Sequence, residues 1–340
     1  MSKKDLLKLL DNVQQHGDDT PEQRRVLFID ALNLFFRNFT VINAINDKGA
    51  HVGGLGGFLR SLGAMIRQIE PTEVYVVFDG MGSSNNRKNL IPEYKSERNT
   101  SRITNWDSFD SHEDEDDSKV DQLTRIIQYL QTLPVRTISI DKVEADDIIA
   151  YYAKSLIKDP TDRMFIVSSD KDYLQLVNEN IIVYSPISKI YYTQDKVKEK
   201  FGLPAYNFIL YKVLMGDNSD KIPGIKGLGA KKIYKLFPEL KGDKLTLDDL
   251  IDLSEGKLKE HIIYARLLSD LDMLEKRHRV MDLENPMIDE EDKAYLDHFA
   301  LTTKVEYYPQ VFLKMYEEDR LGNLIRNVEL WLKDRFEHLK

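Results

Sequence analysis

The stretch Val143-Glu144-Ala145-Asp146-Asp147-Ile148-Ile149 places three carboxylates within four residues. It follows a β-like run over 135–140 and opens an apolar stripe whose spacing predicts a helix starting at Glu144: Ala145, Ile148, Ile149, Tyr152 and Leu156. Acids in the first turn of a helix are favoured by the helix macrodipole. Three acids so close together also repel one another, and a cation among them would relieve that repulsion. The stretch alone therefore leaves two alternatives open, a metal site and an acidic helix start.

Acids also follow four other regular segments of the chain. Asp30 ends the run 26–29, Asp79 ends 74–78, Asp170 and Asp172 follow 165–169, and Asp217 and Asp220 follow 214–216. Sites in open α/β sheets lie in the crevice beyond the carboxyl ends of the strands. Nine acids are therefore predicted to face one crevice: Asp30, Asp79, Glu144, Asp146, Asp147, Asp170, Asp172, Asp217 and Asp220. Oxygen-only ligand sets suit Mg²⁺ or Mn²⁺, and two such ions in one site serve phosphodiester chemistry.

The composition of the 340-residue chain is that of a soluble globular protein, with 42% hydrophobic and 31% charged residues. The chain contains no cysteine, which excludes disulfides and cysteine-based zinc sites and fits a reducing compartment, so we expect a cytoplasmic protein. No apolar run approaches the ~18 residues that a membrane span needs. The net charge of −9 weighs only lightly against a nucleic-acid partner, because the local distribution of charge decides binding.

The pattern of the chain predicts three parts. Residues 1–22 are expected to form an N-terminal extension with a short helix. Alternating strand and helix patterns over 23–193 predict an α/β core with a mainly parallel, helix-covered sheet, in which 181–184 and 190–193 are edge strands. The glycine-rich segment 53–57 is expected to open a helix that stops before Pro71. Residues 194–340 are expected to be helical, with helices around 247–253, 258–280, 293–299 and 308–336.

Between Gly80 and Lys119 the chain loses its regular apolar spacing. A basic segment comes first, and an acidic run over 107–117 follows it. A structureless stretch of this length predicts a mobile functional loop, and we interpret the acidic run as a solvated spacer. A helix is then predicted from the apolar positions Val120, Leu123, Ile127 and Leu130.

The motifs Phe78-Asp79-Gly80, Glu144-Ala145-Asp146-Asp147, Ser169-Asp170-Lys171-Asp172 and 216–224, taken in this order, resemble those of the flap endonuclease/5′–3′ exonuclease family. The resemblance runs from about Leu27 to Phe237, and the segment 105–109 and the long C-terminal part look closest to the phage RNase H branch. It implies a 5′-nuclease (PIN-like) fold. In the family, Asp79, Glu144 and Asp146 would hold one Mg²⁺, with Asp30 acting through water, and the second ion would belong to Asp146, Asp170, Asp172 and Asp220. Asp147 and Asp217 would be the extra acids of the phage pattern.

The resemblance also implies roles for cations. The segment 86–95 looks like the base of the family's helical arch, here 80–119, where Arg87 and Lys95 would contact the scissile phosphate, Tyr94 would stack on a nucleotide and Arg98 would support them. Residues 217–237 resemble its helix–hairpin–helix (helix-three-turn-helix) element, which grips the DNA backbone around a bound K⁺. Glycines before a helix let backbone N–H groups approach a phosphate, although an ordinary glycine-capped turn is the alternative. The residues expected to bind DNA are Ser219, Gly224, Lys226, Gly227, Gly229, Lys231, Lys232 and Lys235.

We therefore expect a monomeric, Mg²⁺-dependent flap endonuclease and 5′–3′ exonuclease with RNase H-type activity. Its expected substrates are DNA with 5′ flaps, nicks or forks and RNA·DNA hybrids, and its candidate partners are a single-strand-binding protein and a sliding clamp. An aspartate-nucleophile phosphatase would need a second acid two residues after the nucleophile, where Leu32 and Met81 stand instead. A DNA-structure-binding replication protein with an inactive site is the alternative that stays open.

Overall fold

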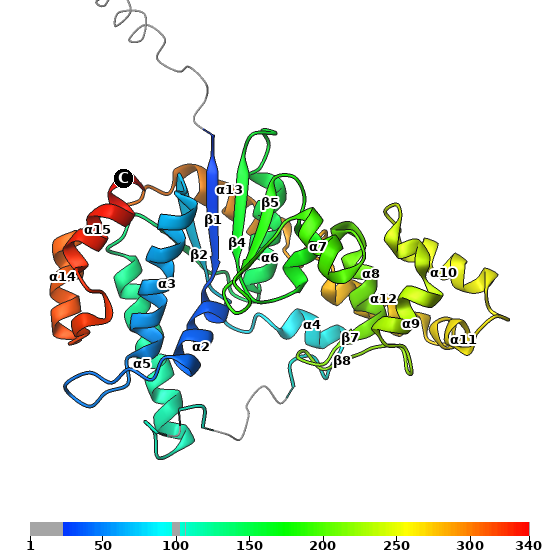
Figure 1. Ribbon diagram of the computed structural model, residues 1–340, viewed down its shortest axis with the longest axis horizontal. Helices are drawn as coiled ribbons and strands as arrows, with labels where there is room; N and C mark the ends of the chain where they lie inside the picture. The colour runs from blue at the N-terminus through cyan, green and yellow to red at the C-terminus, as the bar shows by residue number, and fades with distance from the viewer. Residues whose placement is uncertain (1–22, 97–102, 106, 340) are drawn as a thin grey trace, which may run out of the picture.

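A six-stranded sheet forms the centre of the protein (Figure 1). The computed structural model describes residues 23–96, 103–105 and 107–339. The strand order is β3-β2-β1-β4-β5-β6, in which β1 to β5 are parallel and β6 pairs antiparallel with β5. The strands are β1 (Arg25–Asp30), β2 (Glu73–Val77), β3 (Arg136–Ile138), β4 (Arg163–Val167), β5 (Ile181–Ser185) and β6 (Ile190–Tyr192). The predicted mainly parallel α/β fold is confirmed, but of the two predicted edge strands only β6 lies at an edge of the sheet, because β5 lies inside it and β3 forms the other edge.

The order of the strands places a switch point between β1 and β4. β1 is buried on both faces, with Val26 and Phe28 in one core and Leu27 and Ile29 in the other, which is why it reads as a continuous apolar run. The connection after β1 runs to β2 on one side of this pair of strands, and the connection after β4 runs to β5 on the other side. A crevice is therefore expected beyond the carboxyl ends of β1 and β4. Asp30 lies at that end of β1.

Helices cover both faces of the sheet. One core contains α2 (Ala31–Val41), α3 (Gly53–Ile69) and α5 (His112–Leu130), and residues of α14 (Pro309–Glu318) and α15 (Val328–Phe336) join it. The other core contains α6 (Ala145–Ser155), α7 (Gln194–Phe201) and α13 (Glu290–Thr302). The last three helices thus return to the sheet rather than continuing the helical region that precedes them.

A third core lies beside the sheet and consists of helices and a short hairpin. Its elements are α8 (Phe208–Met215), β7 (Gly216–Asp217), β8 (Ile222–Pro223), α9 (Ala230–Leu236), α10 (Leu247–Gly256), α11 (Ile262–Leu268) and α12 (Leu271–Met281). Ile91 and Tyr94, which follow the short helix α4 (Asn85–Leu90), pack into this core. Figure 1 shows α4 between the sheet and this helical part.

The predicted structureless loop over 80–119 is wrong for the described residues. It contains α4 and the first turns of α5, which begins at His112 rather than near Val120. The acidic run is a helix N-terminus: the Ser111 hydroxyl accepts from the Asp114 backbone N at 3.1 Å, and acids in the first turn favour the helix dipole. Nor is the run wholly a solvated spacer, because the buried Glu115 carboxylate accepts from the backbone N of Thr104 at 2.8 Å and of Asn105 at 2.9 Å.

Three other sequence predictions need correction. In α5, Val120 and Ile127 are exposed and the buried face carries Gln122, Ile126 and Tyr129 instead. The single helix expected over 258–280 is two helices, α11 and α12, and the one expected over 308–336 is α14 and α15. After α14 the chain turns through Arg320 and Gly322, both at φ +54°, a left-handed conformation that ends a helix.

Some predictions lie outside the described residues: the N-terminal extension 1–22, Arg98, and Trp106. Within the described part of the chain, no helix has the length and apolarity needed to cross a membrane.

Candidate active site

Five of the predicted acids line one pocket at the carboxyl end of the sheet: Asp30, Asp79, Glu144, Asp146 and Asp170. They come from the end of β1, the turn after β2, the start of α6 and the turn after β4, so the crossover topology brings them together. Two cations, Arg37 of α2 and Lys95, line the same pocket.

Backbone and hydroxyl groups hold these carboxylates in place. Asp30 caps α2 by accepting from the Asn33 backbone N at 3.1 Å, and it also accepts from the Ser168 hydroxyl at 3.0 Å. Asp79 accepts from the Ala145 backbone N at 2.8 Å, which ties the end of β2 to the first turn of α6. Burial, reinforced by the neighbouring Asp79, raises the pKa of Asp30 to about 7. Burial likewise raises the pKa of Asp79 and, still more, that of Asp146.

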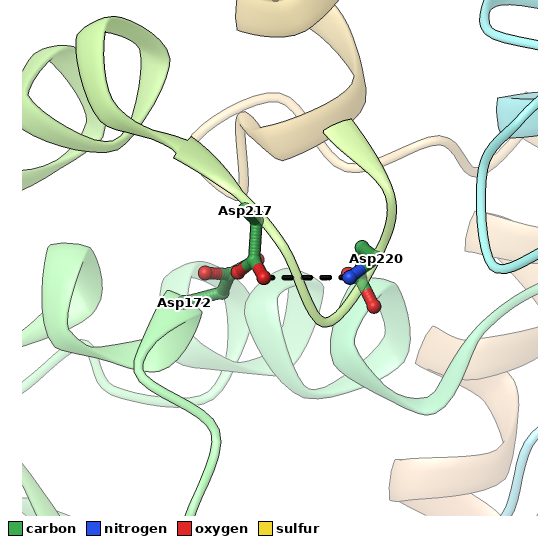
Figure 2. A group of neighbouring side chains, drawn as sticks. All are labelled: Asp172, Asp217 and Asp220. Carbon is green, nitrogen blue, oxygen red and sulfur yellow. Dashed lines mark hydrogen bonds between the residues drawn. The ribbon is translucent and has the colours of Figure 1, made fainter. Parts of the chain in front are cut away.

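Three further acids form a second cluster, shown in Figure 2. Asp172, Asp217 and Asp220 each offer a carboxylate oxygen, and these oxygens all lie within 4.8 Å of one another. The Asp172 backbone N donates to the Asp170 carboxylate at 2.9 Å, so the second cluster adjoins the pocket.

The sequence analysis missed Lys212, whose buried ammonium group pairs with both Asp172 and Asp217. Burial and the facing Asp170 raise the pKa of Asp172 to about 7 despite this partner. Burial acts in the same direction on Asp217, but Lys212 and the Ser219 hydroxyl outweigh it and lower its pKa to about 2. A single lysine within the apolar helix α8, five residues before Asp217, was the signal that could have revealed this pair.

The residues present fit divalent metal ions. Every candidate ligand is a carboxylate oxygen, the donor that Mg²⁺ and Mn²⁺ prefer. Within the described residues, the buried Glu144 Oε1 has no hydrogen-bond partner. This carboxylate oxygen is therefore available to coordinate a metal ion. Eight clustered carboxylates also exceed the nearby cations Arg37, Arg87, Lys95 and Lys212.

Asp147, the ninth predicted acid, does not face the pocket. Asp147 is only 1% exposed. Its carboxylate accepts from Arg87 Nη1 at 2.7 Å and from the Met287 backbone N at 2.8 Å. The prediction that all nine acids face one crevice is therefore wrong for Asp147, because successive positions at a helix start point in different directions.

Arg87 is the partner of Asp147 and is 2% exposed. Its Nε donates to the Val280 carbonyl of α12 at 2.9 Å, and Nη1 lies 3.2 Å from Glu144 Oε2. The Nε, Nη1 and Nη2 groups of the guanidinium thus donate to partners inside the protein. No free donor is left for the predicted contact with the scissile phosphate. The geometry assigns Arg87 instead to joining α4, α6 and α12.

Tyr94 is also interior, at 2% exposure, and its hydroxyl donates to Glu144 Oε2 at 3.0 Å. Its ring packs in the third core, so the predicted stacking on a nucleotide is not supported. Lys95 differs from both, because it lines the pocket with its Nζ 2.6 Å from Glu144 Oε2. Its backbone has φ +52° and its N–H donates to the Asp220 carbonyl at 2.9 Å, which joins the two carboxylate clusters.

The predicted helix–hairpin–helix corresponds to α8, the β7–β8 hairpin, the loop 224–229 and α9. Gly216 and Gly224 face each other so closely that a Cβ on Gly216 would lie 2.2 Å from the Gly224 N, and Gly227 has φ +82°. Lys226, Lys231 and Lys235 are exposed.

Other members of the predicted DNA-binding set have partners within the protein. Lys232 donates to the Gly227 carbonyl at 2.9 Å, and the exposed Ser219 donates its hydroxyl to Asp217. Arg266, which the sequence analysis did not single out, holds the loop through the Lys226 carbonyl at 2.8 Å. Gly229, by contrast, borders open space.

Comparison with known proteins places these features in context. Residues 25–202 match the family described as "5′-3′ exonuclease, N-terminal resolvase-like domain". The 5′-3′ exonuclease of Bacillus subtilis is 31% identical, over 74% of this chain and 81% of its own length. The 5′-3′ exonuclease of Aquifex aeolicus is 28% identical over 80% of this chain and 96% of its own. DNA polymerase I of Bacillus subtilis is 31% identical over 71% of this chain, which spans only 26% of that longer protein.

Solved structures share the fold. The bacteriophage T5 flap endonuclease, in a complex with DNA and metal ions, has a TM-score of 0.62 at 19% identity, over 89% of this chain and 100% of that one. The T5 5′-exonuclease with bound zinc has a TM-score of 0.63 at 21% identity, over 87% of this chain and 98% of that one. At these identities the likeness concerns the fold.

Proposed function

The chain belongs to the 5′-3′ exonuclease family, and we propose that it is a structure-specific 5′ nuclease that hydrolyses phosphodiester bonds with two divalent metal ions. The observation that carries this proposal is the pair of adjoining carboxylate clusters, bridged by the backbone of Lys95 and Asp220. Eight close carboxylates repel one another and so destabilise the folded protein. Such an arrangement is expected only where bound cations offset the repulsion.

The pocket acids Asp79, Glu144 and Asp146, with Asp30 behind them, would hold one ion. Asp170, Asp172, Asp217 and Asp220 would hold the other. When bound, the two ions would lower the pKa of a water molecule and neutralise charge on the phosphate and the leaving oxygen.

The remaining residues set the geometry. Arg87 and Lys95 outweigh the effect of burial on Glu144 and lower its pKa, so this acid stays ionised. Arg87 fixes the start of α6 by pairing with Asp146 and Asp147. Lys95 offers an ammonium group at the pocket, where it would stabilise charge on the scissile phosphate as it develops.

The resemblance to the family supplies the finer parts of this proposal. We propose Mg²⁺ as the natural ion, with Mn²⁺ as a substitute, and DNA flaps, nicks, forks and RNA primers as substrates, as in the phage RNase H branch. The helix–hairpin–helix, with K⁺, would grip duplex DNA through Lys226, Lys231 and Lys235 without reading bases. The protein would act in the cytoplasm as a monomer, with a single-strand-binding protein and a sliding clamp as partners.

A cleavage assay with 5′-labelled flap, nicked and RNA-primed duplexes, with and without Mg²⁺, tests the proposal. We expect Mg²⁺-dependent release of 5′-phosphorylated products. Lys95→Ala should lower the single-turnover rate by about 10²–10³-fold, the usual loss for one charge-stabilising donor, while lowering affinity much less. Binding to branched DNA without cleavage in any metal would instead favour the inactive DNA-structure-binding protein. Equal losses of rate and affinity in the variant would make Lys95 a general phosphate contact.

A further inference from the structure

A single lysine lies inside the second carboxylate cluster. Lys212 belongs to α8, whose other residues carry no charge, and its side chain is only 9% exposed. Its ammonium group donates to Asp172 Oδ1 and to Asp217 Oδ2. Figure 2 shows the carboxylates of Asp172 and Asp217 turned toward one another. A lysine is rarely buried to this extent unless an acid is its partner, and Lys212 has two.

The fold fixes the place of this ammonium group. α8 ends at Gly216, whose backbone N donates to the Lys212 carbonyl and whose φ is +71°. This turn brings the carboxylate of the next residue, Asp217, back to the Lys212 side chain. A Cβ on Gly216 would lie 2.2 Å from the Gly224 N, so the turn requires glycine. On its other side α8 packs against the short helix η1 (Asp172–Leu176), which supplies Asp172.

A metal ion in this cluster would need the carboxylates that Lys212 already contacts. The oxygens offered by Asp172, Asp217 and Asp220 lie within 4.8 Å of one another. Divalent ions bind carboxylate oxygens at about 2.0–2.6 Å, so an ion among these three acids would lie within a few ångströms of the ammonium group. Positive charges repel strongly at that separation in a buried site. The ion and the ammonium group therefore compete for the same acids.

The first cluster differs in this respect. Its lysine, Lys95, contacts Glu144 through Oε2, and within the described residues Glu144 Oε1 has no partner. In the second cluster both oxygens of Asp217 are engaged, Oδ2 by Lys212 and Oδ1 by the Ser219 backbone N at 2.7 Å. The first cluster thus offers an open ligand atom, whereas a cation of the protein itself fills the second.

We propose that Lys212 takes the place of a metal ion in the second cluster of the metal-free protein and thereby keeps the affinity for the second ion low. This inference rests on the proposed two-ion nuclease function. The ammonium group offsets the repulsion between Asp172 and Asp217, and it must leave at least one of them when an ion binds. The charge of a substrate phosphate adds to that of the acids, so the second ion is expected to bind mainly together with substrate.

The test measures Mn²⁺ binding to the full chain without DNA, after removal of metal with chelator. The electron paramagnetic resonance signal of free Mn²⁺ gives the number and affinity of the sites. Lys212→Met removes the charge, and Lys212→Gln removes the charge but keeps a hydrogen-bond donor. Lys212→Arg keeps a cation at the same place and is the matched control.

We expect the second cluster to bind Mn²⁺ about 10²-fold more tightly in Lys212→Met and in Lys212→Gln, because a neighbouring positive charge is gone. Lys212→Arg should resemble the wild type. The gain should disappear when Asp220→Asn is added to Lys212→Met, and it should survive addition of Asp79→Asn, which belongs to the first cluster. These two additions assign the gain to the second cluster.

Thermal melting provides a second measurement. In chelator, Lys212→Met should melt below the wild type, since Asp172 and Asp217 are left to repel each other. Mn²⁺ should then raise the melting temperature of this variant more than that of the wild type, because a tighter ligand stabilises the folded state more. If Lys212→Met does not fold without metal, Lys212→Gln serves for both measurements.

An unchanged or weaker affinity for Mn²⁺ in both uncharged variants would overturn the inference. Lys212 would then orient the acids for the ion rather than take its place, and the proposed nuclease function would stand. If no protein of the series has a Mn²⁺ site that Asp79→Asn or Asp220→Asn removes, the proposed two-ion function fails as well.

Discussion

At the scale of single residues, two cations beside one carboxylate have different tasks. Arg87 and Lys95 both contact Glu144 Oε2, at 3.2 and 2.6 Å. The Arg87 side chain is 3% exposed and has its donors engaged, whereas the Lys95 side chain is 18% exposed and lines the pocket. Their residue types and their match to the family motif predicted that both would contact the scissile phosphate. They could not distinguish the two, because the partners of Arg87 include Val280, almost two hundred residues away.

Replacing Arg87 should therefore mainly lower the free energy of unfolding rather than act on the chemical step. Arg87→Met leaves the buried Asp147 carboxylate without its ion-pair partner and removes one of the two cations beside Glu144, and loss of one member of a buried pair costs about 3–5 kcal/mol. Urea denaturation with chelator present measures this loss. Adding Asp147→Leu should restore part of it, since the unpaired charge is removed. A fully stable Arg87→Met protein would return Arg87 to the role of a phosphate contact.

The Asp30 carboxylate should make stability depend on pH in the absence of divalent ions. Its pKa of about 7, raised by burial, lies above the value in the unfolded chain, so the folded state binds the proton more tightly. Its contribution to stability is present below about pH 4 and is lost as the pH rises to about 7. Asp30→Asn keeps a residue that can cap α2 but removes this titration.

The unfolding free energy of Asp30→Asn, minus that of the wild type, should therefore increase between pH 4 and 8 by roughly 1–4 kcal/mol. Denaturation in chelator at both pH values gives the difference, and other acids cancel because both proteins contain them. A difference that does not vary with pH would show that Asp30 titrates normally in the folded protein.

At the scale of elements, the local sequence pattern predicted those strands and helices that depend on local sequence. The apolar run of β1, the helical stripe of α6 and the glycine-opened α3 were all correctly predicted, because strand and helix periods are visible within a few residues. The start of α5 was missed for lack of an apolar stripe, although Ser111 followed by Asp114 is a capping signal. The docking of α15 could not be predicted, because it depends on which side chain meets Gly63.

That contact makes Gly63 a sensitive position. Gly63→Ala would place a methyl group on the rigid indole of Trp331, and forced overpacking usually costs about 1–3 kcal/mol. We expect a lower melting temperature and an increase in Trp331 solvent exposure, measured by fluorescence quenching. Gly256→Ala is the matched control, because a Cβ there meets nothing within 4 Å and the residue is helical. If both variants melt alike, α15 can move away from α3 without cost.

At the scale of the whole molecule, the acidic net charge conceals an ordered distribution. The sequence predicted that nine acids would gather beyond the carboxyl end of the sheet, and eight of them do so in two adjoining clusters, whereas Asp147 does not. Exposed cations lie on either side, on α9 and over the outer surface of α3, where Arg60, Arg67, Lys189 and Arg326 are exposed. The basic surface on α9 could be predicted from the sequence, because its lysines lie next to the glycines 224–229 in the chain. The second basic surface, over α3, could not be predicted, because its cations come from five separate segments between Arg37 and Arg335.

The lysines of α9 should govern affinity and its salt dependence rather than the chemical step. Lys231 and Lys235 are exposed and four residues apart, hence on one face of the helix. Lys232 is a poor choice for the same test, because its ammonium group holds the Gly227 carbonyl and its loss would disturb the loop. Lys231→Ala with Lys235→Ala should flatten the slope of log K against log salt by about 1.8 on any duplex sequence, at ~0.9 per phosphate contact.

Single-turnover cleavage at saturating DNA should fall far less in this double variant than in Lys95→Ala, because neither Lys231 nor Lys235 lines the carboxylate pocket or belongs to the second carboxylate cluster. Lys158→Ala with Lys304→Ala removes the same charge from two exposed positions outside both basic surfaces and is the control. The slope is measured on a single duplex arm, which α9 is expected to contact. An unchanged slope there would mean that Lys231 and Lys235 face solvent and that the duplex is held elsewhere.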